Sequence, residues 1–585
     1  MSGSRALQAV LIAALAAAPL VAPQFWITLG NYIGLYSIVT LGLVLLTGVA
    51  GQTSFGQAAF VGLGGYTTAY LTTRFGASPW LALAAGLAIT VAVALMLGFI
   101  TLRMKGHYLP LATIAWGISL YFLFGNLDFL GGHTGMPGIP ALSIFGFELR
   151  DERRYFYLIW AIALAALWAT DNLLDSRPGR AIRALKGGLE MAEAFGVNGA
   201  RLKIIAFVYA ALLACISGWL YAHLQRFVNP TPFGINQGIE YLFMAVVGGA
   251  GSVWGAVIGA TVITLLKESL QDYLPRLLGR SGNFEIVVFG ILMVALLQFA
   301  RDGVGPALAR LLPKRRPPKI TNATVLDARE PIASDGPLLE LRGARKQFDG
   351  LVAVSDLSFE IRAREILGLI GPNGAGKSTT FGLISGALSL SSGSVVFRGE
   401  VIDRFEPYEV ARRGIGRTFQ HVKLIGQMSV LDNVALGAYL RGDAGIARAA
   451  LRFDRTEEAR TRATAVQAIA RTGLAERMFD AAGSLSLGQQ RIVEIARALA
   501  ADPVLLLLDE PAAGLRYREK QELRDLLRSL KAQGMTILLV EHDMDFVMGI
   551  TDRLVVMDFG EKIAEGSPGE IQRNPVVLEA YLGGI

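Results

Sequence analysis

Long apolar runs dominate the first 310 residues of this 585-residue chain. A helix that crosses a bilayer needs about 20 mostly apolar residues, because lipid cannot satisfy an exposed backbone. We therefore expect a polytopic α-helical membrane domain over residues 1–309, with about ten spans, give or take two. The candidate runs are residues 6–23, 27–50, 58–73, 79–100, 108–125, 155–170, 204–222, 239–250, 253–266 and 284–300.

Charged residues divide the chain into two parts. Residues 1–310 contain 32 charged side chains, whereas residues 311–585 contain 71. The first part thus has a membrane composition and the second a soluble one. Most of the net charge of +7 lies in the first part, where basic loops between apolar runs are usual for an inner-membrane protein. We infer a lipid bilayer as a partner and no nucleic acid.

The first apolar run resembles a secretory signal, because Arg5 precedes it and residues 16–18 are all alanine. We interpret it as a retained helix, since nine more candidate spans follow. Further along, the polar residues Gln52, Thr53, Ser54 and Gln57 lie at a predicted helix break. They are candidates for lining a transport pathway, and helix-end capping is the alternative.

An amphipathic stretch from Ala184 to Gly199 lies in the basic loop 171–203. It carries Glu190 and Glu193 beside apolar Met191 and Phe195. The pattern predicts a short helix too polar to be buried in lipid. Two interpretations remain open at this point, a solvated connector and a docking helix that inserts into a groove on a cytoplasmic partner.

A basic, proline-broken linker over residues 310–337 separates the two parts. Beyond it, short β-branched runs alternate with helical patterns, which predicts an α/β domain over residues 338–585. The segment G-P-N-G-A-G-K-S at 371–378 matches the phosphate-binding loop of P-loop ATPases. Its backbone N–H groups would surround phosphate oxygens at a helix N-terminus. The predicted contacts come from Gly371, Pro372, Asn373, Gly374, Ala375, Gly376, Lys377, Ser378 and Thr379.

Three further patterns point to nucleotide chemistry. Lys377 would reach the β- and γ-phosphates of ATP, and Ser378 with Asp509 would bind Mg²⁺. Glu510, next to Asp509 after a strand-like run, would polarise the attacking water.

Ser486 and Gln489 precede a helix, where a capping box is the alternative to an anion site. His542 follows the run 536–540 and so lies where ligands bind in open α/β sheets.

The order of these motifs resembles that of an ABC transporter ATPase from about residue 338 to 585. The resemblance rests on the phosphate loop, R-T-F-Q ending at Gln420, L-S-L-G-Q at 485–489, L-L-L-L-D-E ending at Glu510, and His542. The tail at 562–584 resembles the branched-chain amino acid subgroup. The segments at 48–66 and 246–260 resemble permease subunits of the same transporters.

The resemblance implies roles that the residues alone do not. Gln420 would contact Mg²⁺ and sense the γ-phosphate, and Phe348 would stack on adenine. Ser486 and Gly488 would hold the γ-phosphate of ATP bound to a partner ATPase. Glu510 would be the general base, and His542 would steady the γ-phosphate and water. The stretch 184–199 would be a coupling helix.

The family likeness also implies the function and the partners. The chain would be the fused permease and ATPase subunit of an importer of branched-chain amino acids in the inner membrane, with its ATPase in the cytoplasm. Its partners would be a second permease subunit, a second ATPase subunit and a periplasmic solute-binding protein. Arg516 departs from the family pattern in the loop after Glu510. The alternatives are import of urea, short amides or aromatic acids, and an ATPase that regulates a channel without pumping.

Overall fold

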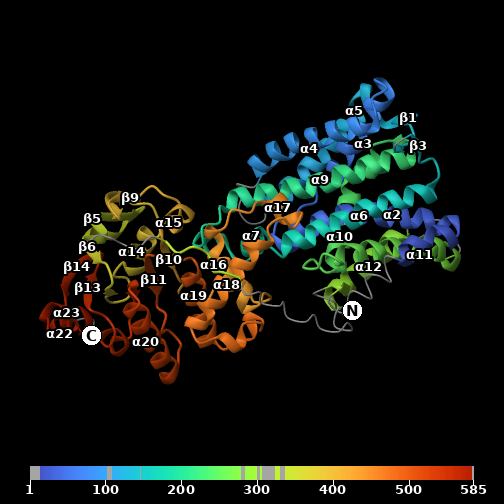
Figure 1. Ribbon diagram of the computed structural model, residues 1–585. Coiled ribbons are helices and arrows are strands. Elements are labelled where there is room, and N and C mark those ends of the chain that lie inside the picture. Colours follow the sequence, from blue (N-terminus) through green and yellow to red (C-terminus); the bar gives the residue numbers. More distant parts are fainter. Residues whose placement is uncertain are drawn as a thin grey trace. The chain divides into compact units, whose positions relative to one another are not determined.

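The computed structural model describes residues 13–101, 108–144, 146–278, 284–299, 303–305, 323–329 and 336–582. Two compact units make up the chain (Figure 1). Unit 1 comprises residues 1–175 and 200–317, and unit 2 comprises residues 176–199 and 318–585. A segment from the middle of the membrane half therefore belongs to unit 2. The predicted linker lies mostly outside the described residues.

Unit 1 is a bundle of helices with two short pairings of two-residue strands, β1 with β4 and β2 with β3. Its helices are α2 (Gln24–Leu43), α3 (Gln57–Arg74), α4 (Pro79–Thr101), α5 (Tyr108–Asn126), α6 (Glu152–Leu174), α9 (Gly199–Gln225), α10 (Ile235–Gly248), α11 (Gly255–Leu278) and α12 (Phe284–Phe299). The π-helix η1 (Val44–Val49) extends α2. The strands are β1 (Met136–Pro137), β2 (Ser143–Ile144), β3 (Phe147–Glu148) and β4 (Phe227–Val228).

The expected number of ten membrane spans is not confirmed. Among the described residues, five helices are long and apolar enough to cross a bilayer: Gln24–Val49, Pro79–Thr101, Tyr108–Asn126, Glu152–Leu174 and Gly199–Gln225. Four more predicted runs are helical as α3, α10, α11 and α12, but their length or polarity sets them apart. The first predicted run is helical over residues 13–21, and its start at residues 6–12 lies outside the described residues.

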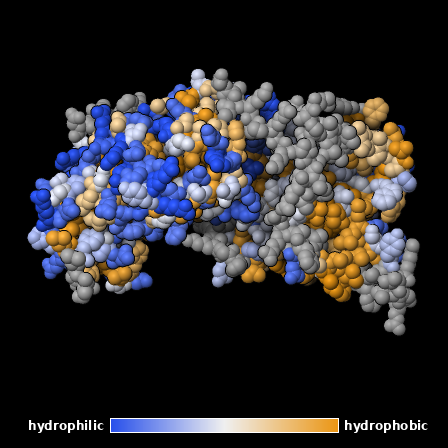
Figure 2. Space-filling model, turned by 90° about the horizontal axis from the view of Figure 1, so that it is seen from below, coloured by the Kyte–Doolittle hydropathy of each residue, from blue (hydrophilic) through white to orange (hydrophobic). Residues whose placement is uncertain are grey.

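Small residues let the helices of unit 1 approach one another closely. A Cβ on Gly64 of α3 would lie 2.2 Å from the carbonyl oxygen of Cys215 in α9, and one on Gly218 would lie 1.9 Å from that of Val61. In lipid there is no hydrophobic driving force for helices to associate, so close packing of this kind stabilises the bundle instead. Many large apolar side chains of unit 1 are exposed, and on the face shown in Figure 2 hydrophobic residues gather on unit 1 and hydrophilic ones on unit 2.

Unit 2 contains two sheets. A six-stranded sheet has the order β10-β11-β12-β7-β13-β14, parallel except for the last strand. Its strands are β7 (Ile366–Ile370), β10 (Ile415–Arg417), β11 (Leu505–Asp509), β12 (Thr536–Val540), β13 (Arg553–Asp558) and β14 (Glu561–Gly566). An antiparallel sheet has the order β6-β5-β8-β9, from β5 (Pro337–Phe348), β6 (Leu351–Arg362), β8 (Ser392–Phe397) and β9 (Glu400–Val401).

The continuous apolar sequences of three parallel strands explain why they lie in the middle of the sheet. Every residue of β7, β11 and β12 is buried, as expected for parallel strands covered on both faces. Because these strands are parallel, the loops that follow Ile370, Asp509 and Val540 emerge at the same edge of the sheet. The predicted phosphate loop, acidic pair and histidine therefore share one edge.

Helices surround the sheets of unit 2. They are α14 (Lys377–Ile384), α15 (Pro407–Arg413), α16 (Val430–Gly437), α17 (Ile446–Ala450), α18 (Arg455–Arg471), α19 (Leu487–Ala500), α20 (Tyr517–Ala532), α21 (Met544–Met548), α22 (Pro568–Ile571) and α23 (Pro575–Leu582). The segment from the membrane half adds α7 (Arg177–Gly187) and α8 (Leu189–Glu193). Figure 1 shows α7 beside α16, α17 and α18, from which it is far away in sequence.

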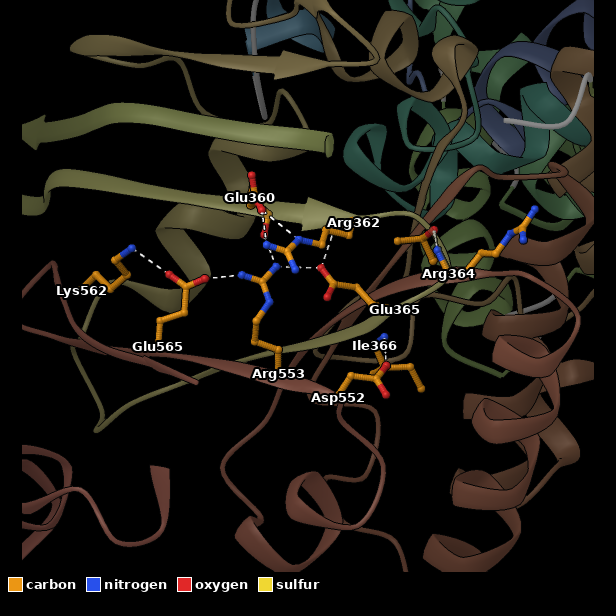
Figure 3. Close-up of polar contacts among 10 residues, drawn as sticks. Glu360, Arg362, Arg364, Glu365, Ile366, Asp552, Arg553, Lys562 and Glu565 are labelled. Atoms are coloured by element: carbon orange, nitrogen blue, oxygen red, sulfur yellow. Dashed lines mark hydrogen bonds and ion pairs between the residues drawn. The ribbon is translucent and has the colours of Figure 1, made fainter. Parts of the chain in front are cut away.

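A charged cluster ties the tail strand β14 to the opposite edge of the parallel sheet (Figure 3). Arg553, the first residue of β13, pairs with Glu365 at 2.8 Å and with Glu565 of β14. It also donates to the carbonyl oxygen of Glu360 at 2.7 Å. Lys562 adds a 2.8 Å contact to Glu565. The tail is thus fixed by polar contacts far from the phosphate loop.

We predict that Arg553→Met lowers the free energy of unfolding by about 2 kcal/mol, since it leaves two half-buried carboxylates without their shared cation. Thermal denaturation of the full chain measures the effect. Arg518→Met is the matched control, because the Arg518 side chain is 91% exposed where it pairs with Glu522. Such surface pairs contribute about 0.5 kcal/mol. Equal losses of stability in the two variants would contradict this account of the cluster.

Candidate functional site

The phosphate loop connects β7 to α14 and has the backbone that its glycines allow. Gly371, Gly374 and Gly376 have φ values of 153°, 87° and 93°, which residues other than glycine rarely adopt. A Cβ on Gly376 would also lie 2.4 Å from the carbonyl oxygen of Ala353. The loop therefore leads directly into the N-terminus of α14, where backbone N–H groups favour an anion.

Lys377 is buried at the start of α14. Its Nζ donates to the carbonyl oxygens of Gly371 and Pro372, at 2.7 and 2.9 Å. Burial lowers the pKa of Lys377, and the nearby carboxylates of Glu510 and Asp509 oppose that shift. The ammonium group is thus held over the loop by two neutral carbonyl oxygens.

Asp509 ends strand β11 and suits a bound cation. Burial raises the pKa of Asp509, and the neighbouring Arg417 acts against this. Among the described residues, its Oδ1 atom is buried without a hydrogen-bond partner. A buried carboxylate oxygen with a free lone pair is the hard donor that Mg²⁺ prefers, and Ser378, the second residue of α14, offers a hydroxyl. The donor set therefore fits Mg²⁺.

Glu510, Gln420 and His542 converge at the same edge of the sheet. The amide of Gln420 donates to Glu510 Oε2 at 3.2 Å, and His542 Nδ1 lies 3.8 Å from the same oxygen. Glu510 has a positive φ of 45°, an uncommon conformation that turns the chain sharply after β11. The structure thus brings three sequence-predicted residues into one group.

Glu541 is a residue of this site that the sequence analysis did not assign. It is fully buried, and burial raises its pKa. Its carboxylate accepts hydrogen bonds from the backbone N–H of Ala512 at 2.6 Å and of His542 at 3.1 Å. It therefore fastens the loop after Glu510 to the loop that carries His542. The acidic residue directly before the histidine was the only sequence signal.

The remaining predicted residues lie apart from this group. Ser486 is the N-cap of α19 and forms a capping box with Gln489, the alternative that the sequence left open. Among the described residues, no hydrogen bond or ion pair links Ser486, Gly488 or Gln489 to the phosphate loop. Phe348 is 41% exposed at the end of β5, and Lys346 lies over its ring at 5.0 Å.

The family-specific tail reaches the phosphate loop, which the sequence did not reveal. Tyr581 in α23 lies near the phosphate loop, where the backbone of Gly371 acts to lower its pKa. Burial raises the pKa of Tyr581 to about 12, so its hydroxyl stays neutral at physiological pH. The tail strand β14 and helix α23 thus support opposite ends of the parallel sheet.

The predicted helix at 184–199 is wrong in its bounds. The chain instead forms the end of α7 and the short helix α8, separated by Gly188 at a φ of 124°. This backbone conformation is not helical, and glycine adopts it without strain, so the helix ends at Gly188. Gly196 is a second constraint, because a Cβ on it would lie 2.1 Å from Leu440 Cγ. We call residues 176–199 the coupling segment.

Two arginines attach the start of the coupling segment to the helical part of unit 2. Arg180, only 2% exposed, makes two hydrogen bonds with Glu458 of α18, at 2.5 and 2.9 Å. Burial alone would raise the pKa of Glu458, but the attraction of Arg180 and Arg462 lowers it. Arg177 donates to the carbonyl oxygens of Tyr439 at 2.6 Å and Ala444 at 2.9 Å.

The end of the coupling segment contacts the loop that carries Gln420. Glu190 of α8 pairs with Lys423 at 2.8 Å. Phe195 packs under the guanidinium of Arg497, 4.5 Å from its ring centre, and Met191 Sδ accepts from the same group at 3.6 Å. Arg497 also donates to the carbonyl oxygen of Lys423 at 2.9 Å.

Helix α19 carries a row of buried charged residues beneath this loop. Arg491 donates to the carbonyl oxygens of Phe419 and Gln420, at 2.8 and 2.5 Å. Glu494 accepts from the backbone N–H of Lys423 at 2.9 Å, and Arg497 completes the row. Residues 419–423 therefore connect the Glu510 group to the coupling segment, with α19 as their common support.

Both halves of the chain match known families. A model of the permease component of a branched-chain amino acid transport system matches residues 26–297, and an ABC transporter model matches residues 354–513. A model of branched-chain amino acid ATP-binding cassette transporters matches residues 561–584. The chain belongs to the branched-chain amino acid ABC transporter family. It is a permease fused to an ATPase that binds and hydrolyses ATP to drive transport.

Relatives of the ATPase part share substantial identity. The high-affinity branched-chain amino acid transport ATP-binding protein LivG of Salmonella typhimurium is 41% identical over 250 residues, which cover 42% of this chain and 98% of LivG. BraF of Pseudomonas aeruginosa, of the same description, is 36% identical with the same coverage. A crystal structure of a nucleotide-free ATP-binding cassette from an ABC transporter shares 32% identity, over 42% of this chain and 100% of that one, with a TM-score of 0.38.

We predict that Arg180→Gln loosens the coupling segment of this ABC transporter. Removing one partner of a buried ion pair costs about 3 kcal/mol. Amide hydrogen exchange in residues 177–187 should therefore quicken about 100-fold, if local opening limits exchange.

The matched control is Arg462→Gln. Arg462 bonds the same carboxylate at 2.8 Å but lies on α18 itself. It should leave exchange in the coupling segment within a few-fold of the wild-type value. Equal protection in Arg180→Gln and the wild type would show that the ion pair does not hold the segment.

Proposed function

We propose that this chain imports branched-chain amino acids across the inner membrane, as one permease and one ATPase of a larger assembly. The observation that carries this proposal is that models of one transport system match both halves of the chain. The names of LivG and BraF support the same substrate class. The domain division that we propose is a permease over 1–309, a linker over 310–337 and an ATPase over 338–585.

For hydrolysis, we propose the roles that the family likeness implies, and the grouping of residues at the sheet edge supports most of them. Lys377 binds the β- and γ-phosphates, and the phosphate loop donates backbone N–H groups to them. Ser378, Asp509 and Gln420 would hold Mg²⁺, which would neutralise phosphate charge when bound. Glu510 accepts the proton of the attacking water, and His542 orients water and the γ-phosphate. Phe348 stacks on adenine.

We propose that the residues of the L-S-L-G-Q motif act on a different nucleotide. Among the described residues, no hydrogen bond or ion pair links Ser486, Gly488 or Gln489 to the phosphate loop, which supports a role toward ATP on a partner ATPase. One chain then supplies two unlike half-sites. ATP binding closes the two ATPases, the loop 419–423 moves with Gln420, and the coupling segment follows.

The proposed function is tested by transport in vesicles. The chain is co-expressed with a permease, an ATPase and a solute-binding protein encoded by neighbouring genes, and the assembly is reconstituted in proteoliposomes. We expect ATP-dependent accumulation of leucine, isoleucine and valine against a gradient. Accumulation of urea or an aromatic acid instead would support the alternative substrates. ATP hydrolysis without accumulation of any of these would favour a channel regulator.

For the hydrolytic site, we predict that Glu510→Gln binds ATP but hydrolyses it at least 100-fold more slowly, because the amide keeps the shape and loses the basicity. Nucleotide binding and phosphate release are measured on the purified assembly. Lys377→Ala is the contrasting variant, which should lose hydrolysis by losing the charge on the phosphates. Loss of ATP binding in Glu510→Gln would mean that Glu510 binds metal or is structural.

For the assembly, we predict one copy of this chain per transporter. Arg516 lies where the family pattern has an acidic residue, which favours pairing with an unlike ATPase. Native mass spectrometry of the co-purified assembly measures the stoichiometry. The chain purified alone should hydrolyse ATP poorly. An active homodimer from cells that lack the partner genes would overturn this prediction.

A further inference from the structure

Arg417, the last residue of β10, is a half-buried cation of unit 2. Its guanidinium donates to the hydroxyl of Ser385 at 2.7 Å. The same group lies over the rings of Phe381 and Phe419, 5.4 and 4.8 Å from their centroids. Its Nε atom is buried and, among the described residues, has no hydrogen-bond partner. One neutral hydroxyl and two rings compensate only weakly for a charge taken out of water.

The strand register places Arg417 on the same face of the sheet as Asp509. Strand β10 runs parallel to β11, and Arg417 pairs with Leu507. Side chains alternate along a strand, so Asp509, two residues beyond Leu507, lies on the same face. Helix α14 covers this face, because its Phe381 belongs to the same apolar cluster as Leu507. The N–H of Asp509 also donates to the hydroxyl of Thr418 at 3.3 Å, which joins the ends of the two strands.

The charges of Arg417 and Asp509 stabilise each other. Burial lowers the pKa of Arg417, and the attraction of Asp509, followed by that of Glu190, opposes this shift. Burial raises the pKa of Asp509, and Arg417 is the cation that opposes this most strongly. Arg491 and Lys377 act in the same direction to a smaller extent. Among the described residues, Arg417 is therefore the principal cation near this carboxylate.

The carboxylate of Asp509 requires a compensating charge before any metal ion binds. Its Oδ1 atom is buried without a hydrogen-bond partner among the described residues, and Glu510 follows it directly in the chain. Two neighbouring carboxylates destabilise a fold unless positive charge compensates them. Arg417 supplies a charge that deprotonation cannot remove. Because Arg417 leaves Oδ1 without a hydrogen bond, this oxygen stays free to coordinate a cation.

We propose that Arg417 is the resident counter-ion of Asp509. It compensates the carboxylate before MgATP binds, and its like charge lowers the affinity of the site for a divalent cation. Arg417 thus acts through Asp509, as a positioning residue. This inference rests on the proposed role of Asp509 in holding Mg²⁺, and it adds a residue that sets how strongly the cation is held.

The first test is a thermal double-mutant cycle on the full chain, without metal or nucleotide. Arg417→Met should lower the thermal midpoint by about 4 °C or more, because it leaves the charge of Asp509 uncompensated. Asp509→Asn removes that charge, so the double variant should have a higher midpoint than Arg417→Met alone. Additive losses would overturn the proposal. If Arg417→Met does not fold, recovery in the double variant supports the charge pair, and failure of both shows a packing role, which overturns it.

The second test measures cation affinity with Mn²⁺ as the probe. Mn²⁺ is titrated into the purified full chain without nucleotide, and the free ion is measured by electron paramagnetic resonance. Binding at the site is the part of the signal that Asp509→Asn loses. Arg417→Met should bind Mn²⁺ about tenfold more tightly, because the repulsion of the neighbouring charge is removed. Arg417→Lys keeps the charge and should stay close to the wild type. Equal or weaker affinity in Arg417→Met would overturn the proposal.

Arg413→Met is the matched control. Arg413 in α15 is also half-buried, with its guanidinium 3.6 Å from the ring centroid of Phe405 and 2.8 Å from Glu400. Its loss should leave the Mn²⁺ affinity within about twofold of the wild type. Equally tightened binding in this variant would show an effect of net charge alone and would contradict the role of Arg417. If the wild type and Asp509→Asn bind Mn²⁺ equally, the proposed role of Asp509 fails, whereas the thermal cycle still decides that of Arg417.

Discussion

The buried charged row on α19 is the interaction that holds residues 419–423 in place beside the coupling segment. Arg491, Glu494 and Arg497 lie one turn apart, and each bonds the backbone of residues 419–423. Arg497 is fully buried, and burial lowers its pKa to about 10, so that it stays charged at neutral pH. Burial raises the pKa of Glu494, against the pull of Arg497.

Such a row is costly to form and therefore sensitive to change. A buried ion pair gains little over apolar packing, but removal of one partner leaves an uncompensated charge. Here the row fixes the position of residues 419–423. The amide of Gln420 lies 3.2 Å from Glu510, and only this short loop separates it from the coupling segment. In the proposed mechanism, a displacement of Gln420 would be passed through this loop to Phe195 and Glu190.

The sequence predicted the local parts of this arrangement. The phosphate loop, the acidic pair and the histidine are short motifs after strands, and parallel strands bring their ends together. The family and the two-part fold were confirmed. Contacts between distant segments were beyond such reasoning: Glu541, Arg491, Arg497 and Arg180 acquire partners only in the folded chain. The prediction of one helix over residues 184–199 was wrong because it relied on the amphipathic pattern and gave no weight to Gly188. The backbone conformation at Gly188 decides where the helix ends.

The measurement that tests this account most directly is the number of leucine molecules transported per ATP hydrolysed, in proteoliposomes with Arg497→Met. The substitution keeps the apolar stem and removes the charge that joins residue 423 to Phe195 and Met191. The account predicts that hydrolysis continues while the transport ratio falls about tenfold or more. An unchanged ratio at normal hydrolysis would show that coupling does not pass through the row on α19.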